Sequence, residues 1–276
     1  MENYSVLMTV YHKEKPEYFT GSIQSMLSQT IRTNDFVVIC DGPLTKELDA
    51  VLENYLKQYP GIFTIIRLPE NVGIGAATNA GLQHCKNDLV AKMDADDLSV
   101  ASRCEKQLEM FGNNPELMVV GGYIEEFDED PEKPFAIRNV PLDNAGIRKY
   151  AKRRQPFNNQ TVMYRRSAVQ AVGGYGDLRR SEDYDLYIRL LKAGCYAQNI
   201  PQVLAHVRVD NSARSRRASL DTMKGCARSR WRAFRIGYSS LLDFLICVTG
   251  EFLIAISPGK LQHFIYCHLL RKECDK

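Results

Sequence analysis

The sequence predicts an α/β protein with a largely parallel β-sheet flanked by helices. Up to about residue 130, short apolar runs alternate with segments of helical periodicity, a pattern typical of strand–helix–strand units. Two of the apolar runs end directly in aspartates, where open α/β sheets place their ligands. The chain has 276 residues, 45% hydrophobic and 25% charged, which suits one large domain with or without an appendage.

The elements of this first part can be listed in order. Predicted strands are SVLMTV (5–10), FVVIC (36–40), FTIIRL (63–68), DLVAKM (88–93) and MVVGGYI (118–124). A helix begins at Pro16, because proline suits the first helical turn. A second helix has Leu48, Leu52 and Tyr55 on one face, and a third is predicted in the small-residue segment GAATNAG.

The later part of the chain is less regular. Residues 128–160 are polar and contain prolines (DEDPEKP, then QPFNNQ), so we expect loop rather than core. A helix is predicted at about 181–193, with Tyr184, Tyr187 and Leu191 on its inner face. No internal repeat or low-complexity segment is present.

The C-terminal region combines a basic run with an apolar run. Residues 208–235 contain nine arginines and lysines against two aspartates, and residues 240–256 are strongly apolar, followed by an amphipathic tail with Leu261, Phe264, Ile265, His268 and Leu269. A buried core helix and a solvated basic face are the simple interpretations. The apolar run is shorter than a membrane span and includes Asp243 and Glu251. We therefore favour a helix lying in a membrane surface, with basic residues at anionic headgroups.

Composition limits the compartment and the partners. The eight cysteines form no C-x-x-C pair, which favours free, buried thiols in a reducing compartment. The first residues lack a basic start followed by an apolar helix, so we expect no signal peptide and a cytoplasmic location. Net charge is only +3, and the basic run has few interleaved aromatic residues, so we expect no nucleic-acid partner.

An acidic cluster follows the fourth predicted strand, in the segment KMDADD. Asp97 or Ser99 could cap the next helix, but a cap explains one acidic residue of three. Hard divalent cations such as Mg²⁺ or Mn²⁺ bind one or two carboxylates and complete their shell with substrate phosphates. Asp94 and Asp96 therefore predict a metal site, and Asp41 is placed equivalently after the second strand.

Two further segments have both a structural and a functional interpretation. NVGIGAATNAG (71–81) is a poor dinucleotide fingerprint, and we predict a small-residue helix beneath a nucleotide site with Asn71 and Asn79 as polar contacts. In RRSEDYD (179–185), acids at the helix start would complement its dipole, with Ser181 as N-cap. Alternatively, Asp183 is a general base.

Taken together and in order, these segments resemble glycosyltransferase family 2, whose members are inverting enzymes of GT-A fold. The resemblance covers about residues 4–210 and rests on SVLMTVYHKEKPEYFTGSIQSMLSQT, VICDG, NVGIGAATNAG, KMDADDLSVASR and GGYGDLRRSEDYDLYIRL. Within the family the chain looks most similar to bacterial enzymes that build O-antigen, capsule or exopolysaccharide repeat units on a lipid carrier.

The resemblance implies a role for each matching residue. Thr9, Tyr11 and Asp41 would line the nucleoside pocket, Asp94 would lie near the ribose and metal, Asp96 would bind the metal, and Asp97 would support the sugar or metal shell. Asp183 matches the catalytic base, and Glu182 would contact acceptor or donor. Many relatives have Y-R-x-H after the sheet; here HVRVDNSARS puts Asp210 at the histidine position, while Arg208 can still meet the diphosphate.

The resemblance therefore implies a metal-dependent, inverting transfer of a hexose, galactose or glucose, from a UDP-sugar. The implied acceptor is a polyprenyl-diphosphate-linked sugar, N-acetylglucosamine as the specific hypothesis, at the cytoplasmic face of the inner membrane. The catalytic domain would span 1–210, with a nucleotide-sugar half to about 127 and an acceptor half from 128, followed by a helical, membrane-associating region at 211–276. The alternatives are a catalytically inactive, membrane-bound sugar-nucleotide-binding protein and a sugar nucleotidyltransferase.

Overall fold

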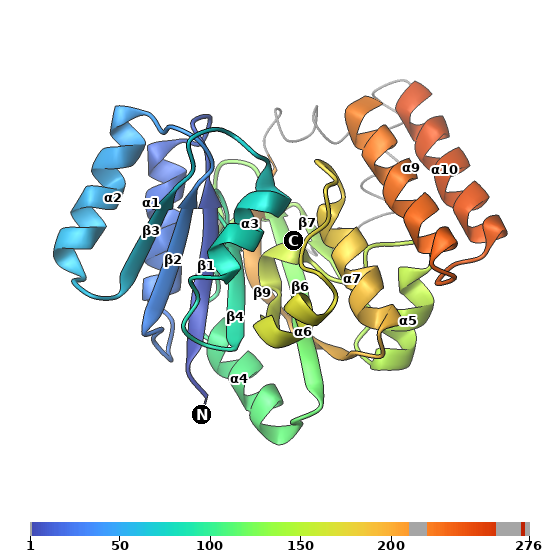
Figure 1. Cartoon of the computed structure of the whole chain (residues 1–276), viewed down its shortest axis with the longest axis horizontal. Helices are drawn as coiled ribbons and strands as arrows, with labels where there is room; N and C mark the ends of the chain where they lie inside the picture. Colours follow the sequence, from blue (N-terminus) through green and yellow to red (C-terminus); the bar gives the residue numbers. More distant parts are fainter. Residues whose placement is uncertain (1, 210–219, 258–271, 274–276) are drawn as a thin grey trace.

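Figure 1 shows the computed structural model of the chain, which describes residues 2–209, 220–257 and 272–273. The described strands form one mixed sheet in the order β10-β7-β6-β8-β4-β1-β2-β3, and β9 pairs with β5 and β6. Helices cover both faces of this sheet. The predicted α/β class is confirmed.

The first half of the molecule consists of regular strand–helix units. Its elements are β1 (Tyr4–Val10), α1 (Pro16–Leu27), β2 (Asp35–Cys40), α2 (Lys46–Gln58), β3 (Phe63–Arg67), α3 (Ile74–Leu82) and β4 (Leu89–Asp94). β1 pairs in parallel with β2 and β4, and β2 pairs in parallel with β3. The carboxyl ends of these strands therefore meet at one edge of the sheet, and α1 begins at Pro16 as predicted.

The second half mixes strand directions. Its elements are β5 (Leu98–Ser99), α4 (Arg103–Asn113), β6 (Leu117–Phe127), β7 (Ala136–Arg138), α5 (Asn144–Ala151), η1 (Asn159–Thr161), β8 (Met163–Arg165), α6 (Arg166–Ala171), α7 (Glu182–Lys192), β9 (Tyr196–Arg208) and β10 (Lys272–Glu273). β8 is antiparallel to β4 and β6, whereas β9 is parallel to β6. The expectation of a largely parallel sheet therefore holds only for the first half.

The interpretation of residues 128–160 as loop was wrong in part. This stretch contains β7, α5 and the start of η1, and it buries Phe157 and Asn158. The Asn158 amide donates to the carbonyl oxygens of Gly122 (2.7 Å) and Arg138 (3.2 Å). The polar side chains that suggested exposure instead satisfy buried backbone groups, which the amino-acid sequence alone does not reveal.

Alternate residues of the central strands feed two cores, one on each face. In β1, Val6 and Met8 pack with α1, α2 and α4, whereas Leu7 packs with α3 and α7. Gly81 of α3 explains why that helix needs small residues. A Cβ atom there would lie 2.4 Å from Leu7 Cδ1 and 2.8 Å from Ile39 Cγ1. The close packing predicted for this helix is thus confirmed.

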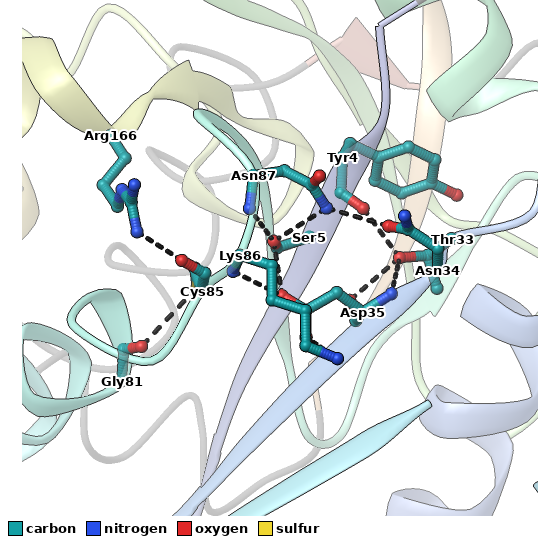
Figure 2. Close-up of polar contacts among 10 residues, drawn as sticks. All are labelled: Tyr4, Ser5, Thr33, Asn34, Asp35, Gly81, Cys85, Lys86, Asn87 and Arg166. Atoms are coloured by element: carbon teal, nitrogen blue, oxygen red, sulfur yellow. Dashed lines mark hydrogen bonds and ion pairs between the residues drawn. The ribbon is translucent and has the colours of Figure 1, made fainter. Parts of the chain in front are cut away.

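The amino ends of the strands are held by a polar network that lies away from the carboxyl ends. Figure 2 shows that the buried Asp35 carboxylate accepts hydrogen bonds from Ser5 Oγ (2.6 Å) and from the Lys86 backbone (2.8 Å). Asn87 donates in turn to Ser5 Oγ. These contacts join β1, β2 and the loop before β4, so the role of Asp35 is structural.

Two helices complete the described chain, α9 (Leu220–Arg235) and α10 (Leu241–Ile256). A capping box between Ser240 and Asp243 begins α10, and Trp231 of α9 packs edge-on against Phe244 (centroids 5.3 Å apart). In the part of the chain that the structure describes, each helix is too short or too polar to cross a membrane. Asp210 and the amphipathic tail after residue 257 lie outside the described residues.

α10 is not a core helix, because one of its faces is exposed. Its large apolar residues that are between 44% and 63% exposed are Leu241, Leu242, Leu245, Ile246, Phe252 and Leu253. The six described cysteines are free, and of these Cys40, Cys85 and Cys104 are buried. Burial raises the pKa of the Cys40 thiol to about 11 and that of Cys85 to about 12, so both stay protonated at neutral pH.

Candidate active site

The carboxyl edge of the parallel strands brings the donor-side predictions together. Thr9 of β1 is the register partner of Asp94 at the end of β4, and β2 ends one residue before Asp41. The parallel pairing of β1 with both neighbours produces this convergence. Tyr11 follows β1 and lies edge-on to His12, with ring centroids 5.7 Å apart.

Asp41 organises the loop before α3. Its carboxylate accepts hydrogen bonds from the backbone of Val72 (2.8 Å) and Gly73 (3.1 Å) and from the Asn71 side chain (2.9 Å). The structure therefore groups Asp41 with Asn71, as two predicted nucleotide contacts. Asn79 has a different position, because its amide both donates to the carbonyl of Tyr175 and accepts from the Tyr175 backbone (2.8 Å each). Asn79 thus fastens α3 to the loop before α7.

Lys92 provides a positive charge inside the acidic cluster. It is buried in β4, and its ammonium group bonds Asp94 Oδ1. Sequence reasoning missed this residue, although a lysine in the middle of the apolar run LVAKM was the available signal. A buried ammonium requires a charged partner, so Lys92 and Asp94 hold each other in place.

The other two aspartates of the cluster differ in environment. Asp96 is partly exposed in the turn after β4 and takes part in interactions with its surroundings. Asp97 is 2% exposed and accepts a hydrogen bond from the Arg208 backbone (2.8 Å). Neither Asp97 nor Ser99 caps the next helix, since α4 begins at Arg103 with Ser102 at the N-cap position. The capping alternative was therefore wrong.

Arg208, at the end of β9, is held beside the same edge. Its guanidinium group lies 3.8 Å from the Tyr18 ring centroid and 4.6 Å from that of Phe127, and it donates to the Asp128 carbonyl (3.3 Å). Such stacking fixes the direction of a guanidinium while leaving its charge available to an anion.

The Glu182–Asp183 pair begins α7. Ser181 is at the N-cap position, but its φ of 60° is left-handed and its side chain makes no capping bond. The prediction of Ser181 as a capping side chain was wrong. It is the one non-glycine residue with positive φ in the described segments. A backbone conformation of this kind costs energy and is found often at functional sites.

Asp183 is oriented by two hydrogen bonds. Its Oδ1 accepts from the Tyr184 backbone and its Oδ2 from Gln155 Nε2, both at 2.7 Å. Burial raises the pKa of Asp183, against these two bonds and the Lys92 ammonium, which lower it. Gln155 was also missed, because nothing in QPFNNQ marks it as a neighbour of residue 183.

The charges at the end of β4 act on the Glu182–Asp183 pair. The pKa of Glu182 is raised to about 7, first by burial and then by the charge of Asp183, while Lys92 lowers it and Asp94 raises it. Asp94 also raises the pKa of Asp183. The end of β4 and the start of α7 are therefore within electrostatic range, with Lys92 acting on both.

Two arginines of the basic run that precedes α10 have a structural role. Arg232 pairs with Asp177 and lies 3.8 Å from Asp185 Oδ1, and Arg230 stacks on the Tyr184 ring at 3.6 Å. These contacts fasten α9 to the first turns of α7. Arg230 and Arg232 therefore do not form a freely solvated face, whereas the lipid-facing role of the basic run remains a prediction.

Comparisons with known proteins agree with this geometry. The sequence model of "Glycosyl transferase family 2" matches residues 5–173. The chain is 37% identical over 273 residues to an uncharacterized glycosyltransferase of Haemophilus influenzae, covering 98% of this chain and 99% of that one. It is 32% identical over 271 residues to the UDP-Gal:alpha-D-GlcNAc-diphosphoundecaprenol beta-1,3-galactosyltransferase of Escherichia coli, covering 98% and 97%.

Solved structures share the fold at low identity. A mannosyltransferase from Pyrobaculum calidifontis, in complex with GDP-Man and Mn²⁺, superposes with a TM-score of 0.67 at 15% identity, covering 91% of this chain and 69% of that one. TarS of S. aureus in complex with UDP-GlcNAc gives 0.66 at 15% identity, covering 94% and 77%. The strand-end aspartates, the acidic pair on α7 and these matches together show that the chain belongs to glycosyltransferase family 2 and is a glycosyltransferase of GT-A fold.

Proposed function

We propose that this enzyme is a metal-dependent, inverting hexosyltransferase that uses a UDP-sugar and extends a polyprenyl-diphosphate-linked sugar. One observation carries the mechanism: the charges of Lys92 and Asp94, at the end of β4, act on the Glu182–Asp183 pair at the start of α7. Inverting transfer requires a group that stabilises the leaving diphosphate and a base on the opposite side of the sugar.

The donor side fits a hard divalent cation. No cluster of three or more His, Cys, Asp or Glu side chains suited to a metal occurs in the described residues. Asp94 and Asp96 are both partly exposed carboxylates, and Mg²⁺ or Mn²⁺ is often bound by two such groups plus substrate phosphates. A cation held by these residues would offset charge on the departing diphosphate.

Lys92 and Arg208 complement that donor site. Lys92 fixes the Asp94 carboxylate, and it also limits the negative charge that Asp94 imposes on Asp183. Arg208 presents a guanidinium group between two aromatic rings at the same edge, where a diphosphate would add negative charge. Asp41 and Asn71 would face the nucleoside, with Thr9 and Tyr11 beside them.

The acceptor side is built for proton removal. As the acceptor oxygen forms its bond to the anomeric carbon, the bond from that carbon to the diphosphate oxygen breaks and the hydroxyl proton passes to the Asp183 carboxylate. The Gln155 and Tyr184 hydrogen bonds hold that carboxylate in one orientation. Its raised pKa makes it a stronger base than an exposed aspartate.

The substrates are proposed from relatives. The Escherichia coli relative is named for transfer of galactose from UDP-Gal to N-acetylglucosamine on diphosphoundecaprenol, and a third relative, 32% identical over 267 residues, is an amylovoran biosynthesis glycosyltransferase of Erwinia amylovora. We therefore place galactose, then glucose, first among donors, and GlcNAc-diphosphate-lipid first among acceptors, in bacterial surface polysaccharide synthesis.

The exposed face of α10 supports membrane association. Leu242, Leu245 and Leu253 recur at helical spacing on this face and are each at least 50% exposed. A contiguous apolar helix face of this kind suits the boundary of a bilayer. The proposed location is the cytoplasmic face of the inner membrane, where a lipid-linked acceptor is presented.

Donor choice can be tested without any acceptor. Thermal unfolding is measured with UDP-, GDP- and dTDP-sugars, with and without Mn²⁺, for the native protein, Asp96→Asn and the loop control Asp130→Asn. A ligand at about 100 times its dissociation constant stabilises the fold by about 2.7 kcal/mol. We expect metal-dependent stabilisation by UDP-sugars that Asp96→Asn alone abolishes. If the protein is folded and none of the sugar nucleotides stabilises it, the proposal is contradicted.

Turnover is then measured with UDP-galactose and a GlcNAc-diphosphate that has a long alkyl tail. Loss of transfer on chelation and its return with Mn²⁺ or Mg²⁺ is the expected result. Transfer that continues unchanged after chelation removes the metal from the proposal. If the product retains the donor's anomeric configuration, the proposal of an inverting mechanism is wrong.

A further inference from the structure

A basic cavity lies beside α5, at the start of α10. Its volume is about 570 Å³, and its charged lining residues are Lys149, Lys152, Arg153, Arg154 and Asp243. Lys152, Arg153 and Arg154 are exposed to solvent. Four cations therefore surround one carboxylate in a space large enough for a phosphate-bearing ligand.

The carboxylate is already neutralised by its neighbours. Asp243 Oδ2 accepts from Ser240 Oγ (2.7 Å) and its Oδ1 from Arg153 Nε (2.6 Å). These contacts with Ser240 and Arg153 lower the pKa of Asp243 to about 2. Among the residues that the structure describes, no carboxylate pairs with Lys149, Lys152 or Arg154. These three cations remain available to an anion.

The chain segment that lines the cavity is linked to the base by one hydrogen bond. Arg154 lines it, and the next residue, Gln155, donates to Asp183 Oδ2 (2.7 Å). The Tyr184 hydroxyl also donates to the Ala151 carbonyl (2.8 Å), which fixes the end of α5 against the start of α7. An anion bound here would therefore lie at a set position relative to the acceptor side of the active site.

The cavity also reaches the start of α10, the helix that carries the exposed apolar residues. Asp243 lines the cavity, and its neighbours in the sequence include Leu242, which is 63% exposed, and Leu245 and Ile246, at 50% and 44%. In Figure 1, α5 and α10 lie together on the side of the molecule away from α2. A ligand with a diphosphate and a long hydrocarbon tail matches this order of surfaces: base, cations, apolar helix.

We infer that this cavity binds the diphosphate of the lipid-linked acceptor, with its sugar toward Asp183 and its hydrocarbon chain along α10. The inference rests on the proposed function and adds to it a recognition site for the acceptor. It explains how the enzyme would select a diphosphate-linked sugar over the same sugar without phosphate. The cavity would do so through charge-assisted hydrogen bonds.

The test uses the double variant Lys152→Gln with Arg154→Gln, which spares Arg153 and its partner Asp243. Its matched control is Arg32→Gln with Lys57→Gln, an exposed arginine and lysine near the opposite edge of the sheet. Initial rates in detergent are measured with the diphosphate-linked acceptor and with a neutral alkyl glycoside of the same sugar.

For the diphosphate-linked acceptor we expect kcat/KM to fall about 10- to 100-fold in the double variant and to stay unchanged in the control. For the neutral glycoside, and for the KM of the donor, both variants should match the native enzyme. An equal loss with both acceptors overturns the inference, since it indicates a general defect. An unchanged kcat/KM together with weaker binding to phosphatidylglycerol vesicles also overturns it, and assigns the cavity to bilayer headgroups.

Titration calorimetry with a short-chain prenyl diphosphate, in saturating UDP, separates this inference from the proposed function. If the native protein transfers sugar to no acceptor, the proposed function fails, and the cavity is judged by calorimetry alone. Binding that the double variant weakens at least about tenfold supports the cavity site. Equal binding by the native protein and the double variant, or no binding to either, excludes it.

Discussion

The proposed donor side and the proposed acceptor side of the active site are built in different ways. The donor side consists of residues at the ends of parallel strands, and its buried cation, Lys92, lies two residues from the carboxylate that it neutralises. The acceptor side consists of a helix start, a loop and two C-terminal helices, joined by contacts such as Gln155 to Asp183 and Arg232 to Asp185. Local pattern produces the first side, whereas contacts between distant segments produce the second.

This difference predicts where single substitutions act. On the donor side they should change metal and nucleotide binding, because the buried Lys92 ammonium is paired with the partly exposed Asp94 carboxylate. On the acceptor side they should change proton transfer, acceptor affinity or membrane binding, one at a time, because the groups belong to separate elements. Four variants test that division, from the largest expected effect to the smallest.

Asp183→Asn should separate chemistry from donor binding. The amide cannot take the acceptor proton, so the rate of transfer should fall by about 10²–10⁴. Thermal stabilisation by UDP-galactose with Mn²⁺ should persist, and Asp130→Asn should behave as the native enzyme. A variant that transfers at the native rate would remove Asp183 as the base.

Lys92→Met should destabilise the donor side and also change the pKa of Asp183 on the acceptor side. It leaves Asp94 without its ammonium partner, and we expect unfolding free energy to fall by about 2 kcal/mol, less than for a fully buried pair because Asp94 is 19% exposed. Lys92 lowers the pKa of Asp183, so its removal should raise that pKa and move the acidic limb of the pH–rate profile upward.

The control for this substitution is Lys57→Met, an exposed lysine on α2. Urea unfolding measures the stability change, and kcat/KM measured against pH gives the position of the acidic limb. A stability loss with no movement of the limb would mean that Lys92 acts on Asp94 alone.

Leu242→Gln with Leu245→Gln should weaken binding to membranes and leave donor binding unchanged. Both side chains are at least 50% exposed on α10, so little packing is lost. Partition into anionic vesicles should weaken about tenfold, because less apolar surface enters the bilayer. Leu56→Gln, on α2 and 42% exposed, is the control. Unchanged sedimentation with vesicles would exclude α10 as the membrane contact.

Glu182→Gln should change how stability depends on pH. The pKa of Glu182 is raised from 4.5 to about 7, so between these values the folded state binds more protons than the unfolded state. This group therefore makes the free energy of unfolding fall as pH rises from about 4.5 to about 7. The variant should lack that fall, whereas exposed Glu129→Gln should keep it. Parallel melting-temperature curves for native and Glu182→Gln proteins would contradict the assignment.

Much of the fold and part of the site were predictable from local pattern. The strands of the first half, the helix beginning at Pro16 and the acidic cluster follow from apolar periodicity and from residues at strand ends. The prediction of loop at 128–160 failed because polar residues such as Asn158 look exposed in the sequence. In the fold they are buried and satisfy backbone groups. The division into domains at residue 210 remains a prediction.

The sequence by itself determined the α/β class, the convergence of Asp41 and Asp94 at one edge, and the family. Apolar runs that alternate with helical segments are repeated, local features, and such strand–helix units bring the carboxyl ends of parallel strands to one edge of a sheet. Only the tertiary structure decided that Gln155 orients Asp183 and that a basic cavity is lined by α5, the segment after it and Asp243 of α10. These contacts depend on how far-separated segments pack, and hydrogen bonds and charge pairs across such distances leave no periodicity in the chain.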